Sequence, residues 1–99
     1  MKLVWSAYAL ADRTLIFDHI EADSPRAAIA VDEKIASALH QLKDFPESGR
    51  PGRVEGTREL VIAGMPYIAI YAVLSDRVRI LRVLHGAQRW PPGPADDRD

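Results

Sequence analysis

The residues best suited to chemistry lie in the second half of the chain, and they are Arg58, Tyr67, Arg82 and His85. Cleavage of RNA by its own 2′-hydroxyl group needs a base, an acid and cations that stabilise the crowded phosphate. The His85 imidazole could act as acid or base, and the two guanidinium groups could clamp the phosphate. Tyr67 or Tyr71 could stack on a nucleobase or position the substrate. These residue types are therefore compatible with a ribonuclease site.

Catalysis is one of two interpretations that these residue types allow. Glu55 or Glu59 could serve as the general base beside the arginines. A histidine at a strand end among surface arginines is also an ordinary solvated feature that needs no function. Both interpretations stay open on residue types alone.

Metal and cofactor chemistry is not indicated by the sequence. The chain contains no cysteine, so disulfides, thiolate nucleophiles and zinc–thiolate sites are excluded. Its three histidines, His19, His40 and His85, lack the companion spacing of a metal site. No glycine-rich phosphate-binding loop is present. We therefore expect no metal and no cofactor.

Charge is distributed unevenly along the 99 residues, whose formal net charge is −1. Residues 1–48 carry five basic and eight acidic side chains, whereas residues 49–90 carry seven basic and three acidic ones. The basic residues of the second block are all arginines: Arg50, Arg53, Arg58, Arg77, Arg79, Arg82 and Arg89. Arginine matches carboxylate and phosphate groups better than lysine does. The overall charge argues against a nucleic-acid-binding protein, but the second block predicts a surface for an anionic partner.

Two helices are predicted after a short strand over residues 2–5. Ser6 can cap a helix over residues 7–23. Ser24 can cap a second helix, with Pro25 at its first position. The apolar residues of this second helix form one stripe: Ala28, Val31, Ile35, Ala38, Leu39 and Leu42. The short break between the helices predicts that they fold back as a hairpin.

The second half of the chain predicts a three-stranded antiparallel meander. Proline and glycine residues indicate an irregular loop over residues 43–54, in which we expect Phe45 to pack under the helix end. Strands follow over residues 57–62, 67–73 and 77–85, and their short links make consecutive hairpins. One face of this meander must cover the helical hairpin.

Arg82 interrupts the apolar pattern of the last strand. The period of two places it on the same face as Ile80 and Leu84. A guanidinium group among apolar side chains is costly unless it is paired or reaches an anion. We expect Arg58, Arg82 and His85 to meet on one face of the neighbouring strands.

These elements predict an α+β fold with an N-terminal strand, a helical hairpin and a three-stranded antiparallel meander packed on the helices. We expect one domain over residues 1–90 and a flexible tail, rich in proline and aspartate, over residues 91–99. The chain has neither the apolar run of a secretion signal nor that of a membrane span. We therefore expect a cytoplasmic protein.

Three segments, taken in order, resemble the RelE/ParE superfamily of toxins from type II toxin–antitoxin modules. Residues 45–53 read Phe-Pro-Glu-Ser-Gly-Arg-Pro-Gly-Arg, like the loop of that superfamily. Residues 56–60 read Gly-Thr-Arg-Glu-Leu and precede a Pro-Tyr pair, like its first hairpin. Residues 82–88 read Arg-Val-Leu-His-Gly-Ala-Gln, close to the Arg-Val-Leu-His-Gly-Ala-Arg ending of ParE-like and plasmid-stabilisation members. The order of the predicted elements also matches, over about residues 3–90.

The resemblance implies a toxin that stops growth when free and a small antitoxin that wraps and silences it in a hetero-oligomer. ParE-like members inhibit DNA gyrase and need no catalytic residues. RelE-like members cut messenger RNA in the ribosome, in which case Arg58, Tyr67, Arg82 and His85 would be the catalytic residues. An inactive, degenerate module of the same fold is a further alternative.

The sequence favours the gyrase inhibitor within this family. RelE-like nucleases often carry lysines on the active face, whereas Lys2, Lys34 and Lys43 all lie outside the meander. The acidic N-terminal half would repel ribosomal RNA, because nucleic-acid affinity depends on neutralising phosphates. The Leu-His-Gly-Ala-Gln ending is closer to the ParE type.

An acidic, amphipathic antitoxin segment, disordered on its own, suits both the helical hairpin and the arginine-rich meander. Apolar anchors would supply affinity, and arginine–carboxylate pairs would supply orientation and association rate. The residues that we expect to contact the antitoxin or the target are Arg50, Arg53, Arg58, Arg79, Arg82, Arg89 and Trp90.

Overall fold

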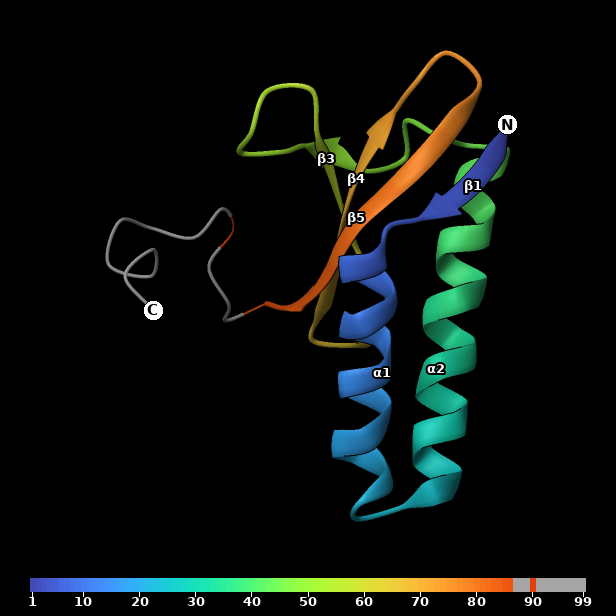
Figure 1. Cartoon of the computed structure of the whole chain (residues 1–99), viewed down its shortest axis with the longest axis vertical. Coiled ribbons are helices and arrows are strands. Elements are labelled where there is room, and N and C mark those ends of the chain that lie inside the picture. The colour runs from blue at the N-terminus through green and yellow to red at the C-terminus, as the bar shows by residue number, and fades with distance from the viewer. Residues whose placement is uncertain (87–89, 91–99) are drawn as a thin grey trace.

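The computed structural model describes residues 1–86 and residue 90. The predicted tail and Arg89 lie outside the described residues. Two helices lie side by side against a sheet and extend beyond its edge (Figure 1). The elements in chain order are β1 (Lys2–Trp5), α1 (Ala7–Glu21), α2 (Pro25–His40), a 3-10 helix (Gln41–Lys43), β2 (Arg50–Pro51), β3 (Arg58–Val61), β4 (Tyr67–Val73) and β5 (Arg77–His85).

Both helices begin where the sequence predicts. The side chain of Ser6 accepts a hydrogen bond from the backbone N–H of Ala9 at 3.0 Å, and that of Ser24 accepts one from Ala27 at 3.2 Å. These bonds satisfy N–H groups that have no partner within the helix. The helices then pair as the predicted hairpin, through apolar contacts and a bidentate Arg13–Asp32 ion pair of 2.8 and 2.9 Å.

The sheet has the strand order β1-β5-β4-β3-β2. The predicted antiparallel meander is confirmed as β3, β4 and β5, and β1 adds to it in parallel beside β5. The loop predicted over residues 43–54 contains one regular piece, because Arg50 and Pro51 pair with β3 as the edge strand β2. Proline is tolerated there because an edge strand leaves one side of its backbone unpaired.

A β-bulge at Leu81 reverses the predicted faces of the end of β5. Ile70 pairs with Arg82, whereas the next residue of β4, Tyr71, pairs with Ile80, so that Leu81 is an extra residue. An extra residue shifts the side-chain alternation by one position. The prediction that Arg82 shares the face of Ile80 is therefore wrong, and Val83 takes the buried position instead.

The helices cover one face of the sheet, which we call the inner face; the opposite side is the outer face. Within the described chain, no helix covers the outer face (Figure 1). The buried cluster between the helices and the inner face comprises Ala9, Ile35, Leu39, Leu42, Ile62, Ala69, Tyr71, Val78, Ile80 and Val83. Neither helix in the described part of the chain is long and apolar enough to cross a membrane.

Phe45 is not part of this core, contrary to the prediction that it packs under the helix end. Its residue surface is 66% exposed, whereas Leu42 is fully buried at the end of α2. Leu42 therefore fills the space that the sequence assigned to Phe45, and the phenyl ring points to solvent.

Candidate functional site

The strand register separates the predicted site arginines between the two faces of the sheet. Glu59 pairs with Ile70 on the outer face, so the preceding residue, Arg58, lies on the inner face opposite Tyr71. Arg82 also pairs with Ile70 and lies on the outer face. The expectation that Arg58 and Arg82 share one face is wrong, because successive strand residues alternate and the bulge adds one more shift.

Arg82 is tied to helix α1 at the edge of β5. Its Nε and Nη2 atoms donate to the two carboxylate oxygens of Asp12 at 2.7 and 2.9 Å. Asp12 also accepts the backbone N–H of Val83 at 2.9 Å, and its residue is only 8% exposed. These hydrogen bonds raise the pKa of Arg82 above its ordinary value. The guanidinium group thus pins α1 to the sheet.

Asp12 takes the position that β1 leaves when the chain turns into the helix. The last β1 pair is Trp5 with Ile80, and beyond it no strand among the described residues neighbours this edge of β5. The side chain of Ser6 donates to the carbonyl of Leu81 at 2.8 Å, and Asp12 accepts the backbone N–H of Val83. The start of α1 therefore completes the hydrogen bonds of an otherwise open strand edge.

Arg58 and Tyr71 both hold the loop that precedes β2. Nη1 of Arg58 donates to the carbonyl oxygens of Gly49 at 2.7 Å and Glu47 at 3.3 Å. The Tyr71 hydroxyl donates to the Pro46 carbonyl and accepts the Gly49 N–H, each at 2.8 Å. Burial raises the pKa of Tyr71, which favours the protonated donor.

Gly49 is required by this close approach. A Cβ atom at its position would lie 2.6 Å from the Tyr71 hydroxyl and 2.8 Å from the Glu59 carbonyl oxygen. The glycine in the family-like loop segment is thus explained by the packing of the tyrosine against the backbone.

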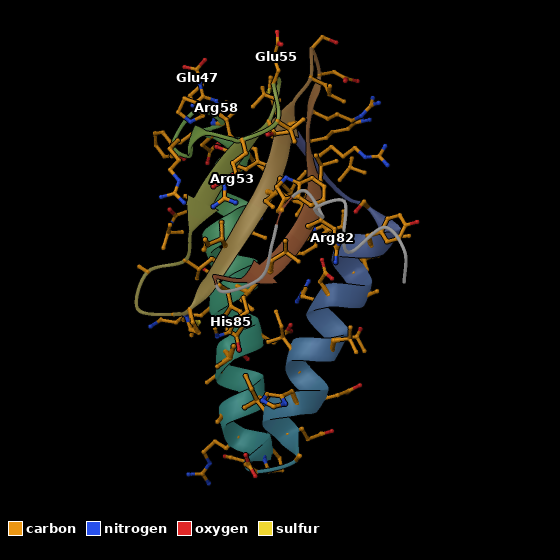
Figure 2. All side chains as sticks on the ribbon, turned by 90° about the vertical axis from the view of Figure 1, so that its left-hand side faces the viewer. Glu47, Arg53, Glu55, Arg58, Arg82 and His85 are labelled. Atoms are coloured by element: carbon orange, nitrogen blue, oxygen red, sulfur yellow. The ribbon has the colours of Figure 1, made fainter. Side chains whose placement is uncertain are left out.

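His85 and Tyr67 lie together at the other end of the sheet. They are strand partners, and their rings meet edge to face with centroids 6.0 Å apart. Figure 2 shows Arg58 near Glu47 at one end of the sheet, with His85 near the opposite end. The four candidate catalytic residues therefore form a pair and two separated arginines rather than one cluster.

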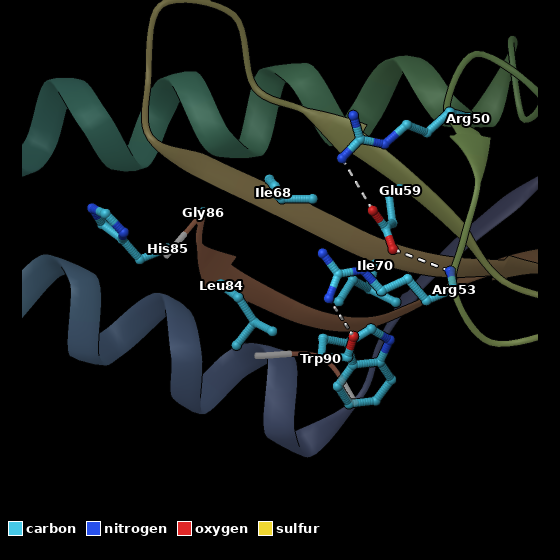
Figure 3. A pocket seen from close by; sticks show the side chains of 9 residues that line it. All are labelled: Arg50, Arg53, Glu59, Ile68, Ile70, Leu84, His85, Gly86 and Trp90. Atoms are coloured by element: carbon cyan, nitrogen blue, oxygen red, sulfur yellow. Dashed lines mark hydrogen bonds and ion pairs between the residues drawn. The ribbon is translucent and has the colours of Figure 1, made fainter. Parts of the chain in front are cut away.

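A small pocket on the outer face is lined by two further predicted contact residues, Arg50 and Arg53 (Figure 3). Glu59, only 8% exposed, accepts from Arg50 Nη2 at 3.1 Å and from the backbone N–H of Arg53 at 3.3 Å. The described lining of the pocket contains two guanidinium groups and one carboxylate, and only the guanidinium group of Arg50 is bonded to that carboxylate. The floor of the pocket is apolar and is formed by Ile68, Ile70 and Leu84.

Trp90 closes one side of this pocket. Its carbonyl oxygen lies 3.5 Å from Arg53 Nη1, and its buried indole nitrogen finds no hydrogen-bond partner among the described residues. The enclosed volume is about 40 Å³, which is room for a few water molecules. The pocket thus suits a small group such as a carboxylate or an aliphatic side chain.

Two predicted contact residues add little to these groups. Arg79 is exposed on the outer face opposite Ala72, where it extends the positive surface. Arg89 lies outside the described residues. Among residues 1–86 and 90, no group of three potential metal ligands occurs.

Asp12 and Glu59 are the site residues whose roles the sequence reasoning missed. Asp12 carried a usable signal, because it lies three residues after Ala9 and four before Ile16 on an otherwise apolar helix stripe. A polar residue at such a position requires a buried partner. Glu59 was weighed as a general base, but its carboxylate is bonded to Arg50 and to the Arg53 backbone.

A helical hairpin on the inner face of a five-stranded sheet is shared with a solved structure. A chain in the structure of the chromosomal ParDE TA system from P. aeruginosa is similar, with a TM-score of 0.79 and 30% sequence identity. The match covers 86% of the present chain and 95% of that chain. The fold and its sequence therefore define a protein of the RelE/ParE toxin class.

Sequence comparison narrows this class. A family model described as the ParE toxin of type II toxin-antitoxin system, parDE, matches residues 3–90. The Y4kP protein of Sinorhizobium fredii, classed as a toxin by inference, is 44% identical over 90 residues, which are 91% of this chain and 93% of Y4kP. Toxin RelE2 of Caulobacter vibrioides is 38% identical over 87 residues, which are 88% and 97% of the two chains. The chain belongs to the ParE toxin family of type II toxin–antitoxin systems, and its partner is an antitoxin.

Proposed function

We propose that this toxin inhibits DNA gyrase by binding to it, without catalysing a reaction of its own. The supporting observation is that Arg58 and Arg82, the two phosphate clamps of a nuclease site, are bonded within the protein. Arg82 neutralises Asp12, and Arg58 is directed at loop carbonyl groups on the other face of the sheet. The bidentate pair with Asp12 occupies Nε and Nη2 of Arg82, and its charge is already matched by a buried carboxylate, so a phosphate would have to compete with that pair.

The separation of the other candidates supports the same conclusion. General acid–base catalysis requires the proton donor or acceptor within hydrogen-bond reach of the reacting group. His85 lies at the end of the sheet away from Arg58 (Figure 2). A ribosome-dependent nuclease is the alternative, and the similarity to a protein named toxin RelE2 keeps it in view.

A side-by-side assay separates the two activities. We expect the purified chain to inhibit supercoiling by gyrase, and the antitoxin to relieve this inhibition. We also expect His85→Ala to inhibit as strongly as the native chain, since the proposal gives the imidazole no chemical step. Cleavage of messenger RNA on ribosomes that disappears in His85→Ala, with supercoiling unaffected by the native chain, would falsify the proposal. Absence of both activities, together with unhindered growth on expression, would indicate a degenerate module.

A further inference from the structure

The loop between the 3-10 helix and β2 presents an exposed aromatic ring. Phe45 is 66% exposed, and its neighbours Asp44 and Glu47 are also exposed. An open hollow lined by residues 44–48 contains this ring, Pro46, two carboxylates and no basic side chain. Three cations lie nearby but do not line the hollow, and they are Lys43, the N-terminal ammonium group and Arg58, which is bonded to the Glu47 carbonyl.

The backbone that carries Phe45 is held from both sides. The N–H of Phe45 donates to the Gln41 carbonyl at 2.9 Å, and its own carbonyl accepts the Ser48 hydroxyl at 2.6 Å. The next carbonyl, that of Pro46, accepts the Tyr71 hydroxyl. The bonds from Arg58 hold the following residues, Glu47 and Gly49.

The fixed position of Phe45 is not explained by packing of the core. Tyr71 is fully buried, and its hydroxyl is used to fix a surface loop. A ring that is mostly in water contributes little burial energy, and Leu42 is fully buried at the end of α2. Because the backbone beneath the ring is already fixed, a partner that covers the ring does not have to order the loop, which is the advantage of a preorganised anchor.

We propose that Phe45 is the apolar anchor through which this toxin docks on its protein target, with Asp44 and Glu47 directing it to a basic surface. Aromatic side chains are enriched at the centres of protein interfaces, and carboxylates around them favour lysine and arginine on the partner. The same carboxylates repel the phosphates of RNA and an acidic antitoxin segment. This inference rests on the proposed function only in that the target is a protein.

The test compares Phe45→Ala with Leu15→Ala, a change at an apolar residue of similar exposure, 67%, on helix α1. We expect Phe45→Ala to raise the concentration for half-inhibition of gyrase roughly tenfold or more, as for a hot-spot residue. Leu15→Ala should leave it unchanged. Both variants should keep their melting temperature, because neither residue is buried. Antitoxin affinity of Phe45→Ala should stay within about twofold of the native value.

Two further variants test the role of the carboxylate at Glu47 and that of the Tyr71 hydroxyl, which holds the loop. Glu47→Lys keeps the ring and should also weaken inhibition, because it places a like charge against a basic partner. Tyr71→Phe releases the loop and should weaken inhibition only while Phe45 is present, so that the double variant is no worse than Phe45→Ala. A purely structural Tyr71 would instead give additive losses.

Each result has one meaning. Native-like inhibition by Phe45→Ala, or an equal loss of antitoxin affinity, overturns the docking role. If the native chain does not inhibit gyrase, the proposed function is wrong. The role of Phe45 is then tested by comparing the growth arrest caused by Phe45→Ala with that caused by the native chain. Arrest by Phe45→Ala as strong as native then overturns the anchor as well, whereas lost arrest with native antitoxin binding supports it on another protein target.

Discussion

Two buried carboxylates in this protein make similar bonds in different surroundings. Asp12 and Glu59 are each 8% exposed, and each binds one arginine and one backbone N–H. Asp12 holds Arg82 through two bonds, and the arginine side chain is 28% exposed. Glu59 holds Arg50 through one longer bond, and that side chain is 58% exposed. The Asp12–Arg82 pair joins α1 to β5, and we call this contact the seam. The Glu59–Arg50 pair lies at the edge of the outer-face pocket, which we call the rim, and leaves N–H donors of Arg50 directed at solvent.

The difference shows which arginines are free to meet a partner. Bidentate pairing to a buried acid uses the fork of a guanidinium group and fixes its plane. A single bond at a rim orients the group but leaves further N–H donors for an incoming carboxylate. The seam around Asp12 therefore serves the fold, and the rim around Glu59, with Arg50 and Arg53, is suited to recognition.

The largest effect is expected at the seam. Asp12→Ala leaves Arg82 and the Val83 N–H without their acceptor in a largely buried position. Removing one partner of such a pair should lower the free energy of unfolding by about 3 kcal/mol. This value is at the lower end of the range for buried pairs because Arg82 retains some contact with water. Urea denaturation of the variant and the native chain measures this loss.

The matched control is Asp32→Ala, which removes the other bidentate aspartate–arginine pair. The side chains of Arg13 and Asp32 are 26% and 31% exposed, so water can replace much of the lost interaction. We expect a loss of about 1 kcal/mol or less. Equal losses in the two variants would mean that burial at the seam does not set its importance.

A smaller loss is expected at the rim. Glu59→Ala deprives Arg50 of a partner, but this exposed guanidinium group can turn to water. Only the Arg53 N–H is left without an acceptor, at a cost of about 1 to 2 kcal/mol in the free energy of unfolding. The same urea titration measures it. A loss as large as that of Asp12→Ala would show that the rim is as structural as the seam.

The sequence predicted the elements better than the site because elements depend on local signals. Ser6 and Ser24 cap helices through neighbours three residues away, so their roles are visible in the sequence. The Asp12–Arg82 pair joins residues 70 positions apart, and only the tertiary fold brings them together. The predicted family, α+β class and antiparallel meander are confirmed for the same reason.

The errors share one physical cause, which is that packing decided between locally equal choices. The bulge at Leu81 places Val83 in the core and moves Arg82 to the outer face. Nothing in an alternating apolar strand marks which residue will be the extra one. Similarly, Phe45 and Leu42 both follow α2 and both could fill the space beneath it, and the leucine does so.

The smallest stability effect, but a measurable kinetic one, is expected from reversing charge at the rim. Arg50→Glu with Arg53→Glu should slow antitoxin association roughly threefold to tenfold at low salt, because the exposed guanidinium groups steer an acidic segment. Screening should remove most of the difference at high salt. Stopped-flow association at two salt concentrations measures both effects.

Arg26→Glu is the control for net charge, since Arg26 is exposed at the start of α2, and Figure 1 shows that this end of the helix lies away from the sheet. If that single reversal slows association as much as either rim reversal alone, overall charge rather than the rim guides the antitoxin, and the contrast between the two carboxylates would concern stability only.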